Sequence, residues 1–406
     1  MKQKIISKQR LVMFRKWTNK SYAVFNSMHK LIKICTLSLS YSILVQPVHV
    51  KAEGADTTGN KTIEIDEVTV QATLLELKAA ETGRLIDVIT GAQLQLKPVS
   101  TVDELLRFLP GIETQSRGAF GAQSDFSIRG ANFNQMLVLI DGHKINDPLT
   151  GHFNSNIPIA PSEIERIEII HGSASAEFGP DAIGGVVNII TKSFLKKQQS
   201  TNNIRSSILM GEHNLINTQI GLFYNVGKAS ISGGSLYNKS DGNLLQSGLR
   251  NFFDIKSNSL SLRYQLSDFW SASYRYSIDN RFFNAQWFYT TSPKDSSTEK
   301  VFRERHHIQI LRCNDKNTTN FSASFINTTD DYKFNSIVRA KNNTKYGLYR
   351  ISHQITINKF FSTLGGIESD MKAIESNNRG NHTLNHYAAF VITNLKPVKK
   401  LNINFS

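Results

Sequence analysis

The second half of the chain, from about residue 200 to Ser406, alternates polar and apolar residues with a period of two. In "LSLRYQL" (residues 260–266), the leucines and Tyr264 fall on one face of a strand, and Ser261 and Arg263 fall on the other. The period recurs in "SASYRYSI", "FSASF", "ISHQITI" and "QIGLFY", with turn signals such as Val226–Lys228 between them. We expect about ten or eleven antiparallel strands joined mostly as hairpins. A lipid-facing barrel and a soluble sandwich both fit, and the repeated Arg, Gln, Asn and Ser on the polar face favour the barrel.

The basic charge of the chain is concentrated at its N-terminus. The net charge is +14, yet residues 1–52 alone hold ten Lys and Arg and no acid. This basic region precedes the apolar run Ile34–Val45 and the modest side chains of Val50 and Ala52, as in a secretory signal peptide. The run is shorter than the roughly 20 residues of a membrane-spanning helix, although an anchor is the alternative. We therefore expect an exported protein and not a nucleic-acid-binding one, with Cys313 the single cysteine after cleavage.

Residues 53–79 read as an exposed tail. Glu53–Lys61 is small and polar, which is typical of disorder. The β-branched alternation of Thr62–Thr73, "TIEIDEVTVQAT", predicts an extended strand. That strand could add to the sheet edge of another protein, or it could be an ordinary first strand.

Residues 80–195 read as a compact α+β domain. A helix is expected after Thr101, with Thr101 and Glu104 as a capping box and Pro110 as the stop. A buried strand is expected at Met136–Ile140, followed by the turn residues Asp141 and Gly142. Ser162–Glu165 predicts a short helical turn before a strand at Ile167–Ile170, and Gly184 and Gly185 precede the last strand.

The small-residue stretch "HGSASAEFG" is a candidate for a phosphate-binding loop or a catalytic site. It lacks the GxGxxG and GxxxxGK[ST] patterns of phosphate loops, and it lacks the GxSxG hydrolase elbow. His171 and Ser173 lie two residues apart on one loop, which is not the geometry of a catalytic triad. A periplasmic hydrolase using Ser173 remains a minor alternative.

The other histidines are scattered. His306 and His307 are adjacent, so on a strand they face opposite sides. His382 and His386 have helical spacing for a metal, but "ESNNRGNHTLNH" reads as a solvated loop. His143 borders a polar loop that leaves the buried strand, where contact with a ligand is plausible.

Charged residues on the edges of the expected domain strands have two readings. They form an ordinary solvated face, or, if the domain sits inside a barrel, a wet and releasable interface with a polar wall. The residues assigned to this plug–barrel interface are Arg129, Arg166, Glu168, His171 and Glu177.

Several motifs together resemble the TonB-dependent outer-membrane receptors. "DEVTVQAT" resembles their coupling box. "LPGIETQSRG", "FSIRGANFNQMLVLIDGHKINDP" and "SEIERIEIIHGSASAEFGPDAIGGVVNIITK" are similar to successive signatures of their plug domain, in the family's order. The expected fold is therefore an α+β plug domain followed by antiparallel transmembrane β-barrel strands.

The resemblance implies import of a scarce metal chelate, a ferric siderophore or cobalamin, and no enzymatic activity or resident cofactor. The TonB box maps to Glu67, Val68, Thr69 and Val70, and the implied partners are TonB, with ExbB and ExbD supplying energy coupling, and outer-membrane lipid. "DPLTGHFNSNIPI" looks more like the cobalamin-type receptors. Ligand-binding candidates at the plug apex are Gln115, Arg117, Phe120, Gln123, Asp125, His143, Asn146, His152 and Asn154.

The sequence departs from the family in three places. His171 stands where Arg is common, and Ser173 stands where Pro is common. The family's barrel has about 22 strands, so residues 200–406 supply about half, too few to close around a plug. We therefore expect a fragment or one half of an interrupted gene. A secreted β-rich binding or adhesion protein without transport is the alternative from another class.

Overall fold

The computed structural model describes residues 69–70, 74–75, 77–97, 99, 101–116, 122–194, 201–289, 292–398 and 401–406. The chain divides into two units, Met1–Glu64 and Ile65–Ser406. The first unit lies outside the described residues, as do Glu67, Val68, Arg117 and Phe120 among the predicted site residues. The expected signal peptide and polar tail are therefore outside the description, which concerns the second unit.

A five-stranded mixed sheet organises the α+β domain. Its strands, in order across the sheet, are β3 (Ile86–Thr90), β8 (Ile164–His171), β9 (Gly185–Thr191), β6 (Met136–Ile140) and β7 (His143–Lys144). The β6–β9 pair is parallel and the other pairs are antiparallel. β6 has the predicted bounds, and all five of its residues are buried, as its unbroken apolar run requires.

Short helices and turns complete the domain. They are η1 (Ala79–Glu81), α2 (Gly91–Gln95), α3 (Val102–Leu106), η2 (Phe133–Gln135), η3 (Gly151–Ser155), η4 (Pro161–Glu163), α4 (Ser175–Phe178), η5 (Pro180–Ala182) and η6 (Lys192–Phe194). The hairpin β4 (Ile112–Ser116) and β5 (Ser124–Ile128) forms a separate two-stranded sheet. No helix in the described part of the chain is long and apolar enough to cross a membrane.

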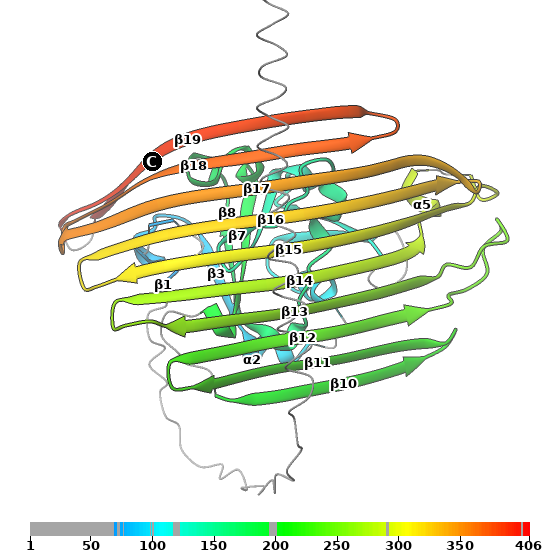
Figure 1. The fold of residues 1–406 in the computed structure, drawn as a ribbon, viewed down its shortest axis with the longest axis horizontal. Helices are drawn as coiled ribbons and strands as arrows, with labels where there is room; N and C mark the ends of the chain where they lie inside the picture. The colour runs from blue at the N-terminus through cyan, green and yellow to red at the C-terminus, as the bar shows by residue number, and fades with distance from the viewer. Residues whose placement is uncertain are drawn as a thin grey trace, which may run out of the picture. The chain divides into compact units, whose positions relative to one another are not determined.

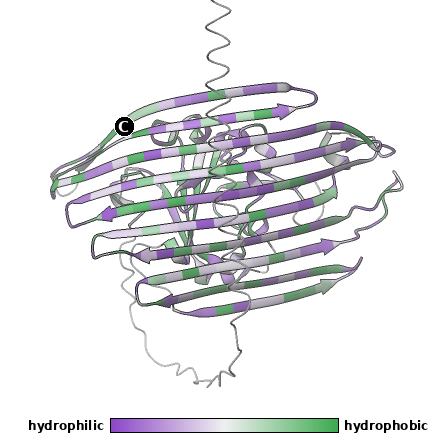
Figure 2. Ribbon diagram, viewed as in Figure 1, coloured by the Kyte–Doolittle hydropathy of each residue, from purple (hydrophilic) through white to green (hydrophobic). Residues whose placement is uncertain are grey.

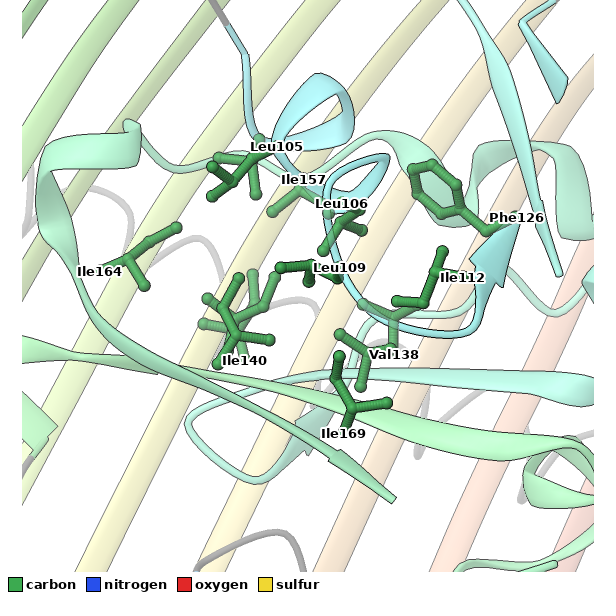
Figure 3. Packing of buried hydrophobic residues seen from close by; sticks show 14 of the residues in the cluster. Leu105, Leu106, Leu109, Ile112, Phe126, Val138, Ile140, Ile157, Ile164 and Ile169 are labelled. Carbon is green, nitrogen blue, oxygen red and sulfur yellow. The ribbon is translucent and has the colours of Figure 1, made fainter. Parts of the chain in front are cut away.

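The domain has its own hydrophobic core beneath α3 (Figure 3). Leu105, Leu106 and Leu109 meet Val138 and the other apolar side chains of the sheet in one cluster. Full burial of one such side chain contributes about 1.5–3 kcal/mol. The core therefore makes the domain a rigid body that can be held or moved as a unit.

One predicted cap is wrong. α3 does begin after Thr101, which has the extended backbone of an N-cap, but its side chain makes no capping hydrogen bond. Thr101 is only 3% exposed, so its hydroxyl is buried instead of reaching the backbone of Glu104. Capping boxes form instead at Thr90, before α2, and at Asn132, before η2.

The described residues from 201 onward form one antiparallel sheet of eleven strands in sequence order, from β10 at the bottom of Figure 1 upward. This confirms the predicted strand number. The strands are β10 (Asn203–Gly211), β11 (Leu215–Val226), β12 (Ala229–Ser240), β13 (Phe253–Gln265), β14 (Trp270–Asn284), β15 (Ser297–Cys313), β16 (Asn317–Phe334), β17 (Ile337–Asn358), β18 (Phe361–Ser376), β19 (Gly380–Val398) and β20 (Leu401–Phe405).

The two faces of this sheet differ sharply in polarity, and Figure 2 shows the alternation along its strands. On β13, Leu260 and Leu262 are 41% and 42% exposed, whereas Ser261 between them is fully buried. The apolar face is thus open and the polar face is covered, the reverse of a soluble sandwich. Such a sheet needs lipid on its open side, so it is a partial barrel wall.

The connections differ between the two ends of the wall. At one end, residues 241–252 and 285–296 form long connections, the second containing α5 (Gln286–Tyr289). At the other end, the connections are short turns such as residues 227–228 and 314–316. The loop predicted around His382 is wrong: His382 and His386 lie in β19, and the short turn 377–379 joins β18 to Gly380, the first residue of β19, which has φ of +79°. The polar–apolar alternation of β19 is hard to see in the sequence, because polar residues stand on both of its faces at this end.

Candidate functional site

The polar face of the wall holds the α+β domain through a buried arginine on β14. Arg275 is 1% exposed. Its Nε lies 3.0 Å from Asp141 Oδ2, and its Nη1 lies 3.3 Å from Glu163 Oε2. Asp141 reaches this position because it takes the left-handed conformation, with φ of +53°, in the turn after β6. Thr191 fixes the carboxylate by donating its backbone N–H to Asp141 Oδ1 at 2.8 Å.

A second arginine, on β15, repeats this arrangement. Arg303 Nη2 lies 3.2 Å from Asp147 Oδ2, and its Nη1 donates to the backbone oxygen of Phe153 at 3.2 Å. Asp147 Oδ1 accepts the backbone N–H groups of Leu149 and Thr150, so the turn before η3 orients the carboxylate. Arginine suits both sites because its planar fork donates to two partners at once.

Serine hydroxyls complete this contact. Ser259 donates to Glu163 Oε1 at 2.5 Å, and Ser193 Oγ lies 2.5 Å from Ser261 Oγ and 2.9 Å from Ser232 Oγ. Each of these groups can exchange its protein partner for water. The interface therefore combines polar bonds with apolar contact, since Phe153 of the domain also packs on Phe253 and Phe283 of the wall.

His143 lies in the same interface. Its ring centroid is 3.2 Å from that of His307 on β15, and its Nδ1 is 3.2 Å from Ser324 Oγ on β16. Burial, helped by the positive charges of Arg350 and Arg305, lowers the pKa of His143 well below its usual value. The imidazole is thus neutral at physiological pH. Its predicted role in ligand contact stays a prediction, and the structure places the side chain against the wall.

The predicted apex residues divide into those whose side chains bond other groups of the α+β domain and Gln123, whose amide does not. Asn146 and Asn154 bond the backbone of their own domain: Asn146 accepts from Val138 N at 2.8 Å, and Asn154 accepts from Asp147 N at 3.2 Å. His152 Nδ1 lies 2.7 Å from Asp125 Oδ1. Gln123 differs, since it is 2% exposed and both atoms of its amide lack a hydrogen-bond partner.

Gln115 is the remaining apex candidate that the structure describes. It is exposed on β4, opposite Asp125 in the hairpin register. The side chain of His152 is 20% exposed and stacks on the ring of Phe133. The role of Gln115, Gln123 and His152 in ligand contact stays a prediction.

The residues predicted for the plug–barrel interface have contacts within the α+β domain. His171 Nε2 lies 2.7 Å from Asp87 Oδ2, and Arg166 Nε lies 2.8 Å from Glu168 Oε1 on the same strand. Arg129 is exposed, with φ of +50°. Their role against a barrel wall stays a prediction.

Glu177 holds the segment that follows the predicted TonB box. Its Oε1 lies 2.8 Å from Arg84 Nη2, and its Oε2 accepts the backbone N–H of Leu74 at 3.2 Å. Burial raises the pKa of Glu177, while Arg84 and the Leu74 N–H act in the opposite direction. The Glu177 carboxyl therefore acts as a latch on Leu74, and the strength of this contact depends on whether the carboxyl is protonated.

The last two residues of the predicted TonB box form β1 (Thr69–Val70), which pairs with β2 (Leu77–Lys78) over two residues. An isolated ladder this short has little stability of its own. Leu75 and Leu77 are buried in a cluster with Leu364 of β18 and Ile392 of β19. We call Leu74, Leu75, Leu77 and Lys78 the strap, because Leu74 is bound to the domain and Leu75 and Leu77 pack against the wall.

The sequence interpretation missed the residues that hold the domain to the wall. The sequence predicts Asp141 only as a turn residue and Asp147 only within a polar apex loop, and it predicts no role for Arg275 and Arg303. One signal was present: arginines stand on the polar side of strands whose other side is apolar. A charge on a covered face needs a buried partner, so acids in the domain turns were the natural candidates.

The residues considered for a hydrolase site or a metal site make other contacts. The hydroxyl of Ser173 bonds that of Ser175 at 2.7 Å, while the ring of His171 binds Asp87. His306 and His307 do face opposite sides, since His306 bonds Tyr274 and the ring of His307 lies tilted against that of His143. Among the described residues, no group of three or more His, Cys, Asp or Glu could hold a metal ion.

Residues 78–186 match the family model of the TonB-dependent receptor plug domain. A vitamin B12 transporter, BtuB, of Vibrio vulnificus strain CMCP6 is 30% identical over 266 residues, which cover 64% of this chain and 40% of the relative. A BtuB of Vibrio cholerae is 31% identical over 169 residues, covering 38% of this chain and 27% of the relative. The chain thus spans less than half of the curated relatives it matches.

Solved structures share the fold. The alcaligin outer-membrane receptor FauA of Bordetella pertussis superposes with a TM-score of 0.64 at 12% identity, over 83% of this chain and 57% of that one. The siderophore receptor PirA of Pseudomonas aeruginosa gives 0.56 at 20% identity, over 77% and 53%.

The α+β domain, which holds the matched residues 78–186, is a plug domain of the TonB-dependent receptor kind. Together with the partial barrel wall, it gives the chain the fold of the solved outer-membrane receptors.

Proposed function

We propose that this chain is the plug and part of the barrel of a receptor that imports cobalamin across the outer membrane. The observation that carries the proposal is the plug's attachment to the wall by buried ion pairs and serine hydrogen bonds. These bonds fix a gate in place, and water can replace them when the gate moves. Cobalamin is favoured over a ferric siderophore because the relatives of about 30% identity are vitamin B12 transporters.

The test of the substrate is uptake by the organism that carries the gene. Deletion at the native locus should abolish uptake of labelled cyanocobalamin and leave uptake of a ferric-siderophore panel unchanged. Loss of one ferric siderophore with normal cobalamin uptake would make the siderophore the substrate. Normal uptake of both, with the protein soluble without detergent, would favour the secreted binding protein.

We propose further that TonB pairs with Glu67–Val70 as an added strand. The weak β1–β2 ladder and the latch at Glu177 support this, because a segment held so lightly can be released. Val68→Pro should abolish uptake, since proline removes a strand N–H and fixes φ. Thr57→Pro, in the polar tail, is the matched control and should transport normally. Unchanged uptake by Val68→Pro would refute the coupling role.

A further inference from the structure

The plug contacts the wall unevenly. Toward β12–β15 it is bound by the two buried arginines and by the hydroxyls of Ser193, Ser232 and Ser261. Arg275 alone contacts Asp141, Glu163 and Thr191. Removing one partner of such a buried pair is costly, because the other charge stays buried and unpaired. We call this contact the fixed seam.

A cavity of about 100 Å³ lies between the plug and the wall, mostly against β16–β18. Its plug side includes Asp141, His143 and Phe178. Its wall side includes Asn320, Ser322 and Arg350, and it extends to Arg263 of β13 and Gln309 of β15. This volume is large enough for several water molecules. The side-chain oxygen of Asn320 has no hydrogen-bond partner within the protein, so it is free to bind water. We call this region the open seam.

The strap closes one end of the open seam. Leu74 and Leu364 both line the cavity, and Leu75 and Leu77 pack on Leu364. Leu74 is tied to the plug by the carboxylate of Glu177, next to Phe178, which also lines the cavity. Movement of the strap would therefore remove part of the cavity wall directly.

We propose that the open seam is a preformed section of the solute's passage, and that the plug parts from β16–β18 while it stays attached along the fixed seam. This rests on the proposed transport function and adds which side of the plug opens. The solute that this section suits has both polar and apolar surface, since serine, asparagine and arginine side chains line the cavity together with leucine and phenylalanine side chains.

Cysteine labelling tests the hydration of the two seams without any transported ligand. Ser322, 3% exposed on the open seam, and Ser261, fully buried on the fixed seam, are matched serines on the covered face of the wall. In a Cys313→Ser background, Ser322→Cys should react at least tenfold faster than Ser261→Cys with a small charged methanethiosulfonate, using purified receptor in detergent. Equal rates, or faster labelling of Ser261→Cys, would overturn the inference.

Tethers test the movement. His143 and Ser324 lie across the open seam, and Ser193 and Ser261 lie across the fixed seam. A short bifunctional thiol linker across His143→Cys and Ser324→Cys should abolish cyanocobalamin uptake, which should return on reduction. A disulfide across Ser193→Cys and Ser261→Cys should leave uptake unchanged.

The tether results separate this inference from the proposed function. Suppose that the reduced forms transport cyanocobalamin. If only the Ser193–Ser261 tether then blocks uptake, or if neither tether blocks it, the inference is overturned and the proposed function stands. A Cys313→Ser parent that binds and moves no cyanocobalamin, in cells where deletion also has no effect, overturns the proposed substrate. The labelling ratio then still decides whether the open seam is the wet side.

Discussion

At the scale of the residue, Arg275 is the side chain on which the attachment of the plug depends most. It serves two carboxylates and the hydroxyl of Thr191 from a fully covered position. A lysine could not reproduce this, because a single ammonium lacks the planar fork of the guanidinium. The residue therefore sets both the position of the plug and the conformation of the turn at Asp141.

Replacing this arginine should loosen the plug. Arg275→Ala leaves Asp141 and Glu163 buried without a counter-charge, and we expect a loss of about 3–5 kcal/mol. Trypsin should cut the plug faster in the detergent-solubilised receptor, and the first thermal transition should fall. Arg339→Ala is the control, because Arg339 is exposed beside Phe334. Equal trypsin sensitivity of the two variants would contradict the assignment.

Glu177 predicts a dependence on pH. Its pKa is raised above the ordinary 4.5, chiefly by burial. A carboxyl whose folded-state pKa is raised adds stability that is fully present below its unfolded pKa and is lost as pH rises through the folded pKa. Attachment of the strap should therefore weaken as pH rises from about 4.3 through that raised value.

The measurement is proteolysis of the strap across this pH range in the wild type and in Glu177→Gln. The glutamine keeps the shape of the side chain and cannot ionise, so its curve should be flat where the wild-type curve rises. Parallel curves for the two proteins would show that another group is responsible.

At the scale of the element, the loop that precedes β9 is shaped by close packing. A Cβ on Gly185 would lie 2.5 Å from the backbone oxygen of Ile170 and 2.9 Å from Ile128 Cδ1. This supports the interpretation of Gly184 and Gly185 as residues that allow backbones to approach, and it argues against a phosphate loop, because a strand and not a helix follows.

Gly185→Ala should therefore destabilise the plug by about 1–3 kcal/mol through overpacking. Gly365→Ala on β18 is the matched control, since a Cβ there has nothing within 4 Å. Thermal unfolding of both variants in detergent checks this. A loss at Gly365→Ala as large as at Gly185→Ala would mean that general strand effects, and not this contact, are responsible.

The strands were largely predictable because their signal is local. Alternation along "LSLRYQL" identifies which side chains share a face, and the structure covers the polar face as expected for a barrel. The partners were not predictable, since they depend on register between distant strands. His143 meets His307 only because β15 presents that ring opposite β7, and no property of either sequence segment specifies this contact.

At the scale of the whole second unit, the open apolar face is what separates the membrane interpretation from a secreted one. Leu262→Arg would place a charge on this face, and in a bilayer we expect a cost of about 2–4 kcal/mol near its middle. The variant should accumulate less in the outer-membrane fraction. Lys256→Arg, exposed on the same strand face, is the control.

A soluble binding protein would tolerate Leu262→Arg, because the side chain is already 42% exposed. Equal yields of folded protein from Leu262→Arg and Lys256→Arg would therefore contradict the membrane assignment.

The contact between the plug and the wall also has a consequence that calorimetry can measure. Exposure of apolar surface raises the heat capacity and exposure of polar surface lowers it. Unfolding the plug exposes its core of Leu, Ile and Val. Undocking it exposes Ser, Arg, Asp and Glu side chains together with a smaller apolar contact around Phe153. Because the polar and apolar contributions have opposite signs, undocking should proceed with a smaller heat-capacity change than unfolding, and its free energy should vary less with temperature.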